Sequence, residues 1–141
     1  MRMLGSILGW TILLAFFIAA IGCGGSNRAA VAGRVSLDDK VIDGGSICFI
    51  PIGENHGPAA WGEIKAGDYS ISAKTGPAIG ANRVEIRWTR KTGRILRPAR
   101  GPNLAEEEFK DFIPARYNSR SELKTELKPG QNQADFELKS K

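Results

Sequence analysis

Few side chains in this sequence of 141 residues could do covalent chemistry. Two cysteines, Cys23 and Cys48, are too few for a disulfide scaffold or a four-cysteine zinc site. The one histidine, His56, lies in a loop at residues 53–58, and no serine stands in the G-x-S-x-G elbow that presents a catalytic nucleophile. We therefore expect a solvated histidine and no catalysis. A small envelope hydrolase that uses His56 is the alternative.

The most unusual feature is a basic segment. Between residues 83 and 100 one acidic residue, Glu85, opposes seven basic ones, which gives a charge of +6. From Thr89 onward, glycines and prolines predict a long exposed loop over residues 89–102. This loop could bind phospholipid head groups, acidic glycans or the acidic face of a partner. Its cations are Arg90, Lys91, Arg94, Arg97 and Arg100. The alternative is a solvated loop, partly neutralised by the acidic run at residues 106–108.

A metal site has little support in the sequence. Asp38, Asp39 and Asp43 do not have the spacing of a calcium loop such as the EF-hand. The three adjacent glutamates at 106–108 are not a matched pair of catalytic carboxylates. We predict no metal and no cofactor. Cys48 lies in an apolar segment, which predicts a buried thiol that acts as a small hydrophobe.

Residues 1–22 predict an export signal. Arg2 gives a basic start, and the uncharged, mostly apolar run at residues 4–21 ends just before Cys23. Two other interpretations are an uncleaved membrane anchor and an ordinary cleaved signal that leaves the Cys23 thiol free. All three place the rest of the chain outside the cytoplasm, which disfavours nucleic acid as a partner.

The residues before Cys23, Ala20-Ile21-Gly22, resemble the lipobox of bacterial lipoproteins. Leucine is usual in that family where Ala20 stands. The resemblance implies that the Cys23 thiol carries diacylglycerol, that a peptidase cuts before it, and that its new amine is acylated, for example with palmitate. It also implies a location at the bacterial cell envelope, facing the periplasm or the exterior. Two or more acyl chains anchor a protein securely, at about 0.8 kcal/mol per buried CH₂.

The remaining residues predict short strands separated by turns. Apolar and polar residues alternate with a period of two in several segments, as in half-buried strands; these are residues 31–37, 69–73, 81–88, 123–128 and 134–139. Residues 46–52 are apolar on both faces, which predicts a central strand. Gly67 predicts a hairpin turn, and Pro129-Gly130 joins the last two segments into a predicted closing hairpin. About seven strands imply an all-β, antiparallel β-sandwich.

One helix is predicted, from Asn103 to Ile113. Asn103 could cap it, the acidic run favours its first turn, and Pro114 would end it. The aromatic side chains of Trp61 and Tyr117 could stack on a ligand, but in so small a domain they are expected to close the core.

The order of the strand motifs resembles carboxypeptidase regulatory-like domains, which belong to the transthyretin-like group. The motif V-x-G-x-V falls at residues 31–35, a strand ending in F-x-P at 44–51, and G-x-Y-x-apolar at 67–71. The motif I-P-x-x-Y-N at residues 113–118 is shared with small bacterial lipoproteins that carry this domain alone. One departure is Asp39, because the family's turn commonly has glycine there. The resemblance implies a Greek-key β-sandwich and an extracytoplasmic compartment, but no reaction.

Together these patterns predict a lipoprotein signal peptide at residues 1–22, a flexible tether at 23–30 and the β-sandwich at 31–141. We predict a non-catalytic binding or structural role at the cell envelope. The expected partners are the membrane, through the lipid anchor, and an acidic envelope component or a protein.

Overall fold

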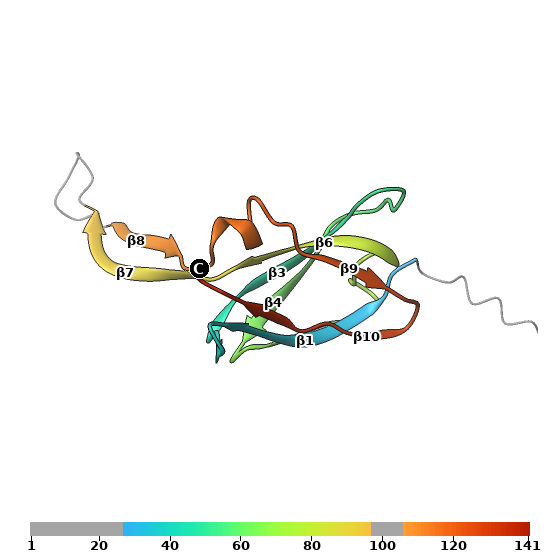
Figure 1. Ribbon diagram of the computed structural model, residues 1–141, viewed down its shortest axis with the longest axis horizontal. Helices are drawn as coiled ribbons and strands as arrows, with labels where there is room; N and C mark the ends of the chain where they lie inside the picture. Colours follow the sequence, from blue (N-terminus) through green and yellow to red (C-terminus); the bar gives the residue numbers. More distant parts are fainter. Residues whose placement is uncertain (1–26, 97–105) are drawn as a thin grey trace, which may run out of the picture.

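The computed structural model describes residues 27–96 and 106–141, which are almost entirely strands and connecting turns (Figure 1). This confirms the prediction of an all-β fold. The elements follow one another as β1 Ala30–Leu37, β2 Lys40–Val41, β3 Gly44–Pro51, β4 Ala60–Lys65, β5 Asp68–Ile71, β6 Gly80–Arg87, β7 Thr89–Leu96, β8 Glu106–Asp111, the 3-10 helix η1 Ala115–Tyr117, β9 Lys124–Leu127, β10 Gln131–Gln133 and β11 Phe136–Leu138.

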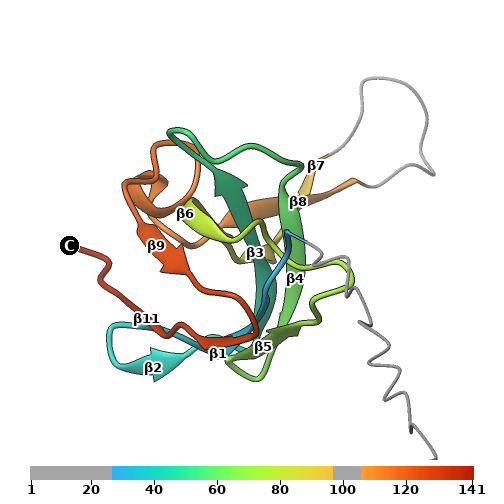
Figure 2. The same ribbon diagram turned by 90° about the vertical axis from the view of Figure 1, so that its right-hand side faces the viewer.

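Nine of these strands belong to one sheet that curls on itself. The strands run in the order β10-β1-β5-β4-β3-β6-β9, and β2 and β11 also pair with β1. Seen from the end, the sheet is a half-barrel around the buried core (Figure 2). The predicted sandwich is therefore a sandwich-like arrangement of one curled sheet. The remaining two strands, β7 and β8, form a separate two-stranded sheet.

The alternation of apolar and polar residues determines which face of a strand points inward. In β6, Val84 and Ile86 are fully buried, whereas Glu85 between them lies on the outer face. In β3, Phe49 belongs to the core cluster, while Cys48 lies on the outer face beside Glu85 and is also buried. The prediction of a buried Cys48 is confirmed. Each fully buried large apolar side chain contributes roughly 1.5–3 kcal/mol.

Two tight turns between strands use left-handed backbone. Strands β4 and β5 join through Ala66 and Gly67, whose φ angles are +49° and +82°. These angles are those of the turn that suits a twisted hairpin, so the prediction at Gly67 is confirmed. Strands β1 and β2 join through Asp38 and Asp39, with φ of +50° and +66°. Aspartate is among the residues other than glycine that tolerate this conformation, because its short side chain can hydrogen-bond to the local backbone.

The C-terminal strands close the sheet, so the predicted closing hairpin is wrong. β9 pairs antiparallel with β6, whereas β10 and β11 run parallel to β1. The chain does turn at Gly130, where φ is +91°, but it then crosses to the opposite edge of the sheet. Gly33 in β1 permits this crossing, because a Cβ there would lie 1.8 Å from the carbonyl oxygen of Ala134. The Tyr69 hydroxyl donates to the same carbonyl at 2.6 Å.

Two predictions between residues 89 and 113 are also wrong. Residues 106–111 form β8 instead of a helix, and residues 89–96 form β7 instead of a loop. A helix of about ten residues is marginal by itself. Strand pairing with the basic β7 gives the acidic run of β8 both backbone hydrogen bonds and opposite charges. Residues 97–105 lie outside the described part of the chain.

The domain begins before residue 31. Arg28 forms a β-bridge with Ala78, and Ala29 is fully buried, so residues assigned to the tether pack on the domain. The predicted signal peptide and Cys23 lie outside the described residues. Within residues 27–96 and 106–141, no helix has the length and apolar character needed to cross a membrane.

Candidate functional site: a projecting two-stranded arm

Strands β7 and β8, which we call the arm, project from one end of the half-barrel. Figure 1 shows the arm at the end of the molecule opposite the start of β1. All eight residues of β7 are exposed. Only Trp88 separates β6 from β7, so the arm extends a core strand by roughly 25 Å at the usual rise of a strand.

The two strands of the arm are electrically neutral. Four cations face four carboxylates in them, namely Arg90, Lys91, Arg94 and Lys110 against Glu106, Glu107, Glu108 and Asp111. Lys91 forms an ion pair with Glu107, and Arg94 lies 3.9 Å from Glu108. Arg90 lies 3.6 Å from Asp43, which lies between β2 and β3. The predicted anion-binding residues in β7 thus have carboxylate partners, and the other two, Arg97 and Arg100, lie outside the described residues.

Large apolar side chains are exposed on the arm. Ile95 is 59% exposed, Phe109 58% and Leu96 41%. Lys91 and Phe109 lie opposite each other in the two strands. The Lys91 ammonium lies 5.9 Å from the centre of the Phe109 ring, so this pair also makes a cation–π contact. Aromatic and aliphatic side chains surrounded by charged residues are typical of surfaces that bind proteins.

Trp88 fixes the base of the arm to the main sheet. Its indole Nε1 donates to Asp43 Oδ1 at 2.7 Å, and its ring lies 5.9 Å from the ring of Phe112. The guanidinium of Arg90 lies 5.2 Å from the Trp88 ring. Gly45 allows the β3 backbone to pass this point, because a Cβ there would lie 2.3 Å from the carbonyl oxygen of Arg87.

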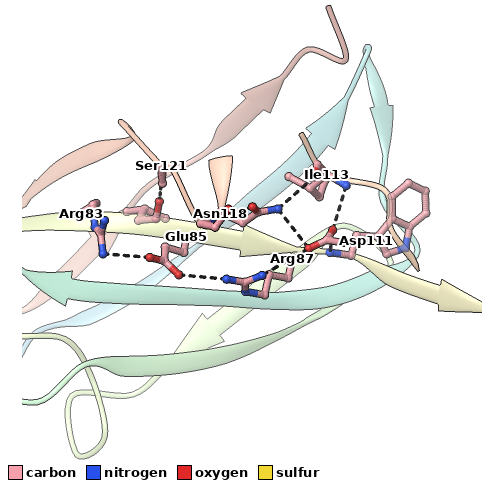
Figure 3. Close-up of polar contacts among 10 residues, drawn as sticks. Arg83, Glu85, Arg87, Asp111, Ile113, Asn118 and Ser121 are labelled. Carbon is pink, nitrogen blue, oxygen red and sulfur yellow. Dashed lines mark hydrogen bonds and ion pairs between the residues drawn. The ribbon is translucent and has the colours of Figure 1, made fainter. Parts of the chain in front are cut away.

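Asp111 joins both strands of the arm to the loop that follows (Figure 3). Its Oδ1 accepts hydrogen bonds from the backbone amides of Trp88 at 3.1 Å and Ile113 at 3.0 Å. Its Oδ2 accepts from Asn118 Nδ2 at 3.1 Å and lies 3.8 Å from Arg87. Asn118, which is buried, also donates to the Ile113 carbonyl at 3.1 Å. The final asparagine of the I-P-x-x-Y-N motif therefore holds the base of the arm.

On the outer face of the main sheet, the Glu85 carboxylate forms ion pairs with two more cations of the basic segment. Glu85 lies 3.0 Å from Arg83 and 3.6 Å from Arg87 (Figure 3). Cys48 lies opposite Glu85 in the sheet. Burial raises the pKa of the Cys48 thiol to about 11, and the Glu85 carboxylate adds to the shift. A thiol held protonated in this way is a poor nucleophile.

The two aromatic residues expected in the core differ in their position. Tyr117 packs against the core, and its hydroxyl accepts from the backbone amide of Lys139 at 3.2 Å, so that expectation is confirmed. Trp61 is 60% exposed on the outer face of β4, next to Cys48 on β3, so the expectation for Trp61 is wrong. Its strand position places it on the face opposite the buried Ala60 and Ile64, because side chains alternate across a sheet.

His56 is exposed in the loop between β3 and β4. It lines a cavity of about 420 Å³ together with Asn27, Arg28, Gly57, Pro58, Lys74 and Ala78. Among the described residues that line this cavity there is no carboxylate, hydroxyl or thiol. The three aspartates weighed as calcium ligands have separate partners: Asp38 accepts from the Ser140 amide, Asp39 pairs with Lys139, and Asp43 binds Trp88. In the part of the chain that the structure describes, no three His, Cys, Asp or Glu side chains gather as a metal site.

Asp43, Trp88 and Asp111 hold the arm, a role that was not predicted from the sequence. Trp88 stands at the end of a clear alternating strand, and Asp111 follows the acidic run. These signals mark strand ends, but they do not reveal that Asp43 and Trp88, which are 45 residues apart, come together.

The chain matches no protein-family model and no curated protein sequence. Among solved structures it is similar to a DUF3823 family protein from Parabacteroides merdae, with a TM-score of 0.40 and 14% sequence identity. The similarity covers 78% of this chain and 45% of that protein, so the chain spans less than half of the matched protein's length.

Proposed function

We propose that this protein is a lipid-anchored, extracytoplasmic binding module without catalysis, and that the arm binds another envelope protein. The observation that carries the proposal is the exposed arm itself, whose Ile95 and Phe109 are both more than half exposed. Arg90, Lys91 and Arg94 already have carboxylate partners, so burial of these apolar side chains would supply most of the binding energy.

The anchor and the family belong to the same proposal. The lipobox-like Ala20-Ile21-Gly22-Cys23 supports acylation of Cys23. The likeness to carboxypeptidase regulatory-like domains is supported by V-x-G-x-V, in which Val31 and Val35 are fully buried while Gly33 accommodates the C-terminal segment.

A polyanion ligand for the arm is the second candidate, and Arg97 and Arg100 in residues 97–105 favour it. The two candidates differ in salt dependence. Binding of a polyanion by exposed cations weakens strongly as the ionic strength rises, whereas an apolar contact does not.

The test removes the arm without disturbing its base. Thr89 and Asp111 are opposite each other in the sheet, so an Asn-Gly turn can replace residues 90–110 and keep the Trp88 and Asp111 contacts. The full-length protein and this variant are crosslinked in the native envelope, and their captured partners are identified by mass spectrometry. A second variant, Ile95→Ser with Phe109→Ser, removes only the apolar contact surface. A charge swap, Lys91→Glu with Glu107→Lys, is the matched control.

We expect one protein to be captured by the wild type and the charge swap and lost from both other variants, in a manner insensitive to salt. Capture of the same proteins by the wild type and by all three variants would contradict the role of the arm. Loss on charge swapping, together with release by salt, would support the polyanion candidate instead.

A further inference from the structure

Three basic side chains from separate segments line one pocket at the end where the chain enters the domain. Arg28 precedes β1, His56 lies between β3 and β4, and Lys74 lies between β5 and β6. The pocket has a volume of about 420 Å³, and Pro58 and Ala78 form its apolar wall. This is a different part of the molecule from the arm.

The backbone around the pocket is held by hydrogen bonds. Arg28 Nη1 donates to the Gly76 carbonyl at 2.9 Å, which fixes the guanidinium beside the loop that carries Lys74. On either side of Arg28, the amide of Ala29 donates to the Pro77 carbonyl at 2.8 Å, and the Asn27 carbonyl accepts from the Ile79 amide at 3.1 Å. The segment 27–29 is therefore fastened to the domain, which fixes this side of the pocket.

The positive charge of this pocket has no acidic partner in the chain. Every aspartate and glutamate lies within the described residues, because residues 1–26 and 97–105 contain none. No described carboxylate lies within ion-pair distance of Arg28 or Lys74. The imidazole of His56 adds an N–H donor in either protonation state. A concave site with these donors and no carboxylate suits an anionic group such as a phosphate.

The position of the pocket, close to the proposed anchor, favours a lipid as the source of such a phosphate. Four residues lead from Cys23 to Asn27, so an acylated Cys23 would hold the pocket within about 14 Å of the membrane surface. We propose that Arg28, His56 and Lys74 bind the phosphate of an anionic phospholipid head group. This inference rests on the proposed lipid anchor. Such binding would set the domain upright, with the arm directed away from the membrane, because the arm lies at the opposite end (Figure 1).

The test uses residues 23–141 with Cys23→Ser, a form without an acyl chain. The whole core cluster lies between Ala29 and Leu138, so this form retains every contact that builds the domain. The protein is mixed with phosphatidylcholine vesicles, with and without about 30% phosphatidylglycerol. Lys74→Glu is compared with Lys110→Glu, because both lysines are exposed and without a carboxylate within ion-pair distance in the described residues, and Lys110 lies on the arm. Thermal unfolding checks that both variants fold.

We expect phosphatidylglycerol to increase vesicle binding, and Lys74→Glu to lower it about 25-fold, at about fivefold per unit of charge near the surface. Lys110→Glu is expected to stay within about twofold of the wild type. An equal loss in both variants would overturn the proposal, because net charge alone would then explain the binding. So would binding that does not depend on phosphatidylglycerol.

A second experiment adds inorganic phosphate or glycerol phosphate to the protein without vesicles. A shift of the His56 ring resonances with these ions, without vesicle binding, would assign the pocket to a soluble phosphate and overturn the lipid assignment. None of these outcomes depends on acylation of Cys23, which is tested separately in cells. Failure of the head-group proposal is therefore distinguishable from failure of the anchor.

Discussion

The carboxylate of Asp111 accepts a hydrogen bond from the backbone amide of Trp88 at 3.1 Å. These two residues stand at the foot of the two arm strands, where β6 becomes β7 and where β8 ends. The same oxygen accepts from the Ile113 amide at 3.0 Å, so one side chain fixes both strands relative to the core.

Asp111→Ala is expected to lower the free energy of unfolding by about 2–3 kcal/mol, because two backbone amides and Asn118 lose their acceptor. Urea unfolding measures this loss, and amide hydrogen exchange should show faster exchange at Trp88 and Ile113. Glu108→Ala, whose side chain bonds Thr92 on the arm, is the control and should cost less than about 1 kcal/mol. Similar losses in both variants would contradict the role given to Asp111.

Gly45→Ala is expected to destabilise the domain by about 3 kcal/mol. The residue has φ of +131°, and a Cβ would lie 2.3 Å from the Arg87 carbonyl oxygen. Gly44→Ala is the matched control, because its nearest neighbour, the Ile64 carbonyl oxygen, would be 3.7 Å away. Thermal unfolding of the two variants should separate them, and equal melting temperatures would show that β3 does not pass so close to the arm base.

Ala66→Gly is expected to stabilise the protein by about 1 kcal/mol. Ala66 has φ of +49° in the turn between β4 and β5, a conformation that costs an L-residue with a Cβ about 1–2 kcal/mol and costs glycine little. Ala73→Gly, at an exposed turn position outside the left-handed region, should give no gain. Chemical denaturation compares the two, and an equal effect at both positions would rule out relief of strain at Ala66.

The Cys48 thiol is expected to react slowly with a disulfide reagent at pH 8 in the Cys23→Ser form, because it is buried and its pKa is raised to about 11. The unfolded thiol, with a pKa near 9, ionises first as the pH rises. The contribution of Cys48 to stability is therefore full below pH 9 and falls as the pH rises from about 9 to about 11. Cys48→Ala should lack this part of the pH dependence. Rapid labelling of the native protein would contradict a buried Cys48.

If Cys23 carries the proposed lipid anchor, Cys23→Ser is expected to release the protein from membranes and to stop its processing, because a serine cannot take the thioether-linked diacylglycerol. Cell fractionation and the mobility of the precursor measure both effects. Cys48→Ala, which leaves the lipobox intact, should remain in the membrane fraction. Retention and normal processing of the Cys23→Ser protein would remove the lipoprotein assignment.

Local patterns in the sequence were enough to predict most strands of the main sheet and which of their faces is buried. The period-two alternation correctly placed Val84 and Ile86 in the core, and the apolar segment around Cys48 correctly predicted a buried thiol. Gly67 correctly marked a hairpin turn. These features depend on a residue and its near neighbours, since side chains alternate across a strand wherever that strand is placed.

The predicted helix and the predicted closing hairpin failed because the sequence does not specify which strands pair. Glu106, Glu107 and Glu108 favour a helix start by local preference, but β7 offers a paired edge with opposite charges, and this pairing outweighs the local preference. In the same way, β10 and β11 pair with the edge of β1, whereas the predicted hairpin would have paired this C-terminal segment with β9. An edge becomes available only once the rest of the sheet has formed.

The sequence by itself determined the all-β character and the buried face of most strands of the main sheet, and the export signal in its first 22 residues stays a prediction. The tertiary structure alone decided that residues 89–96 of the basic segment form one strand of a neutral arm, that Asp43 meets Trp88, and that Arg28, His56 and Lys74 share one pocket. The physical reason is the range of the interactions. The burial of a side chain in a strand depends on the alternation of neighbouring residues. Charge pairing and pocket formation depend on distant segments that the curl of the sheet brings together.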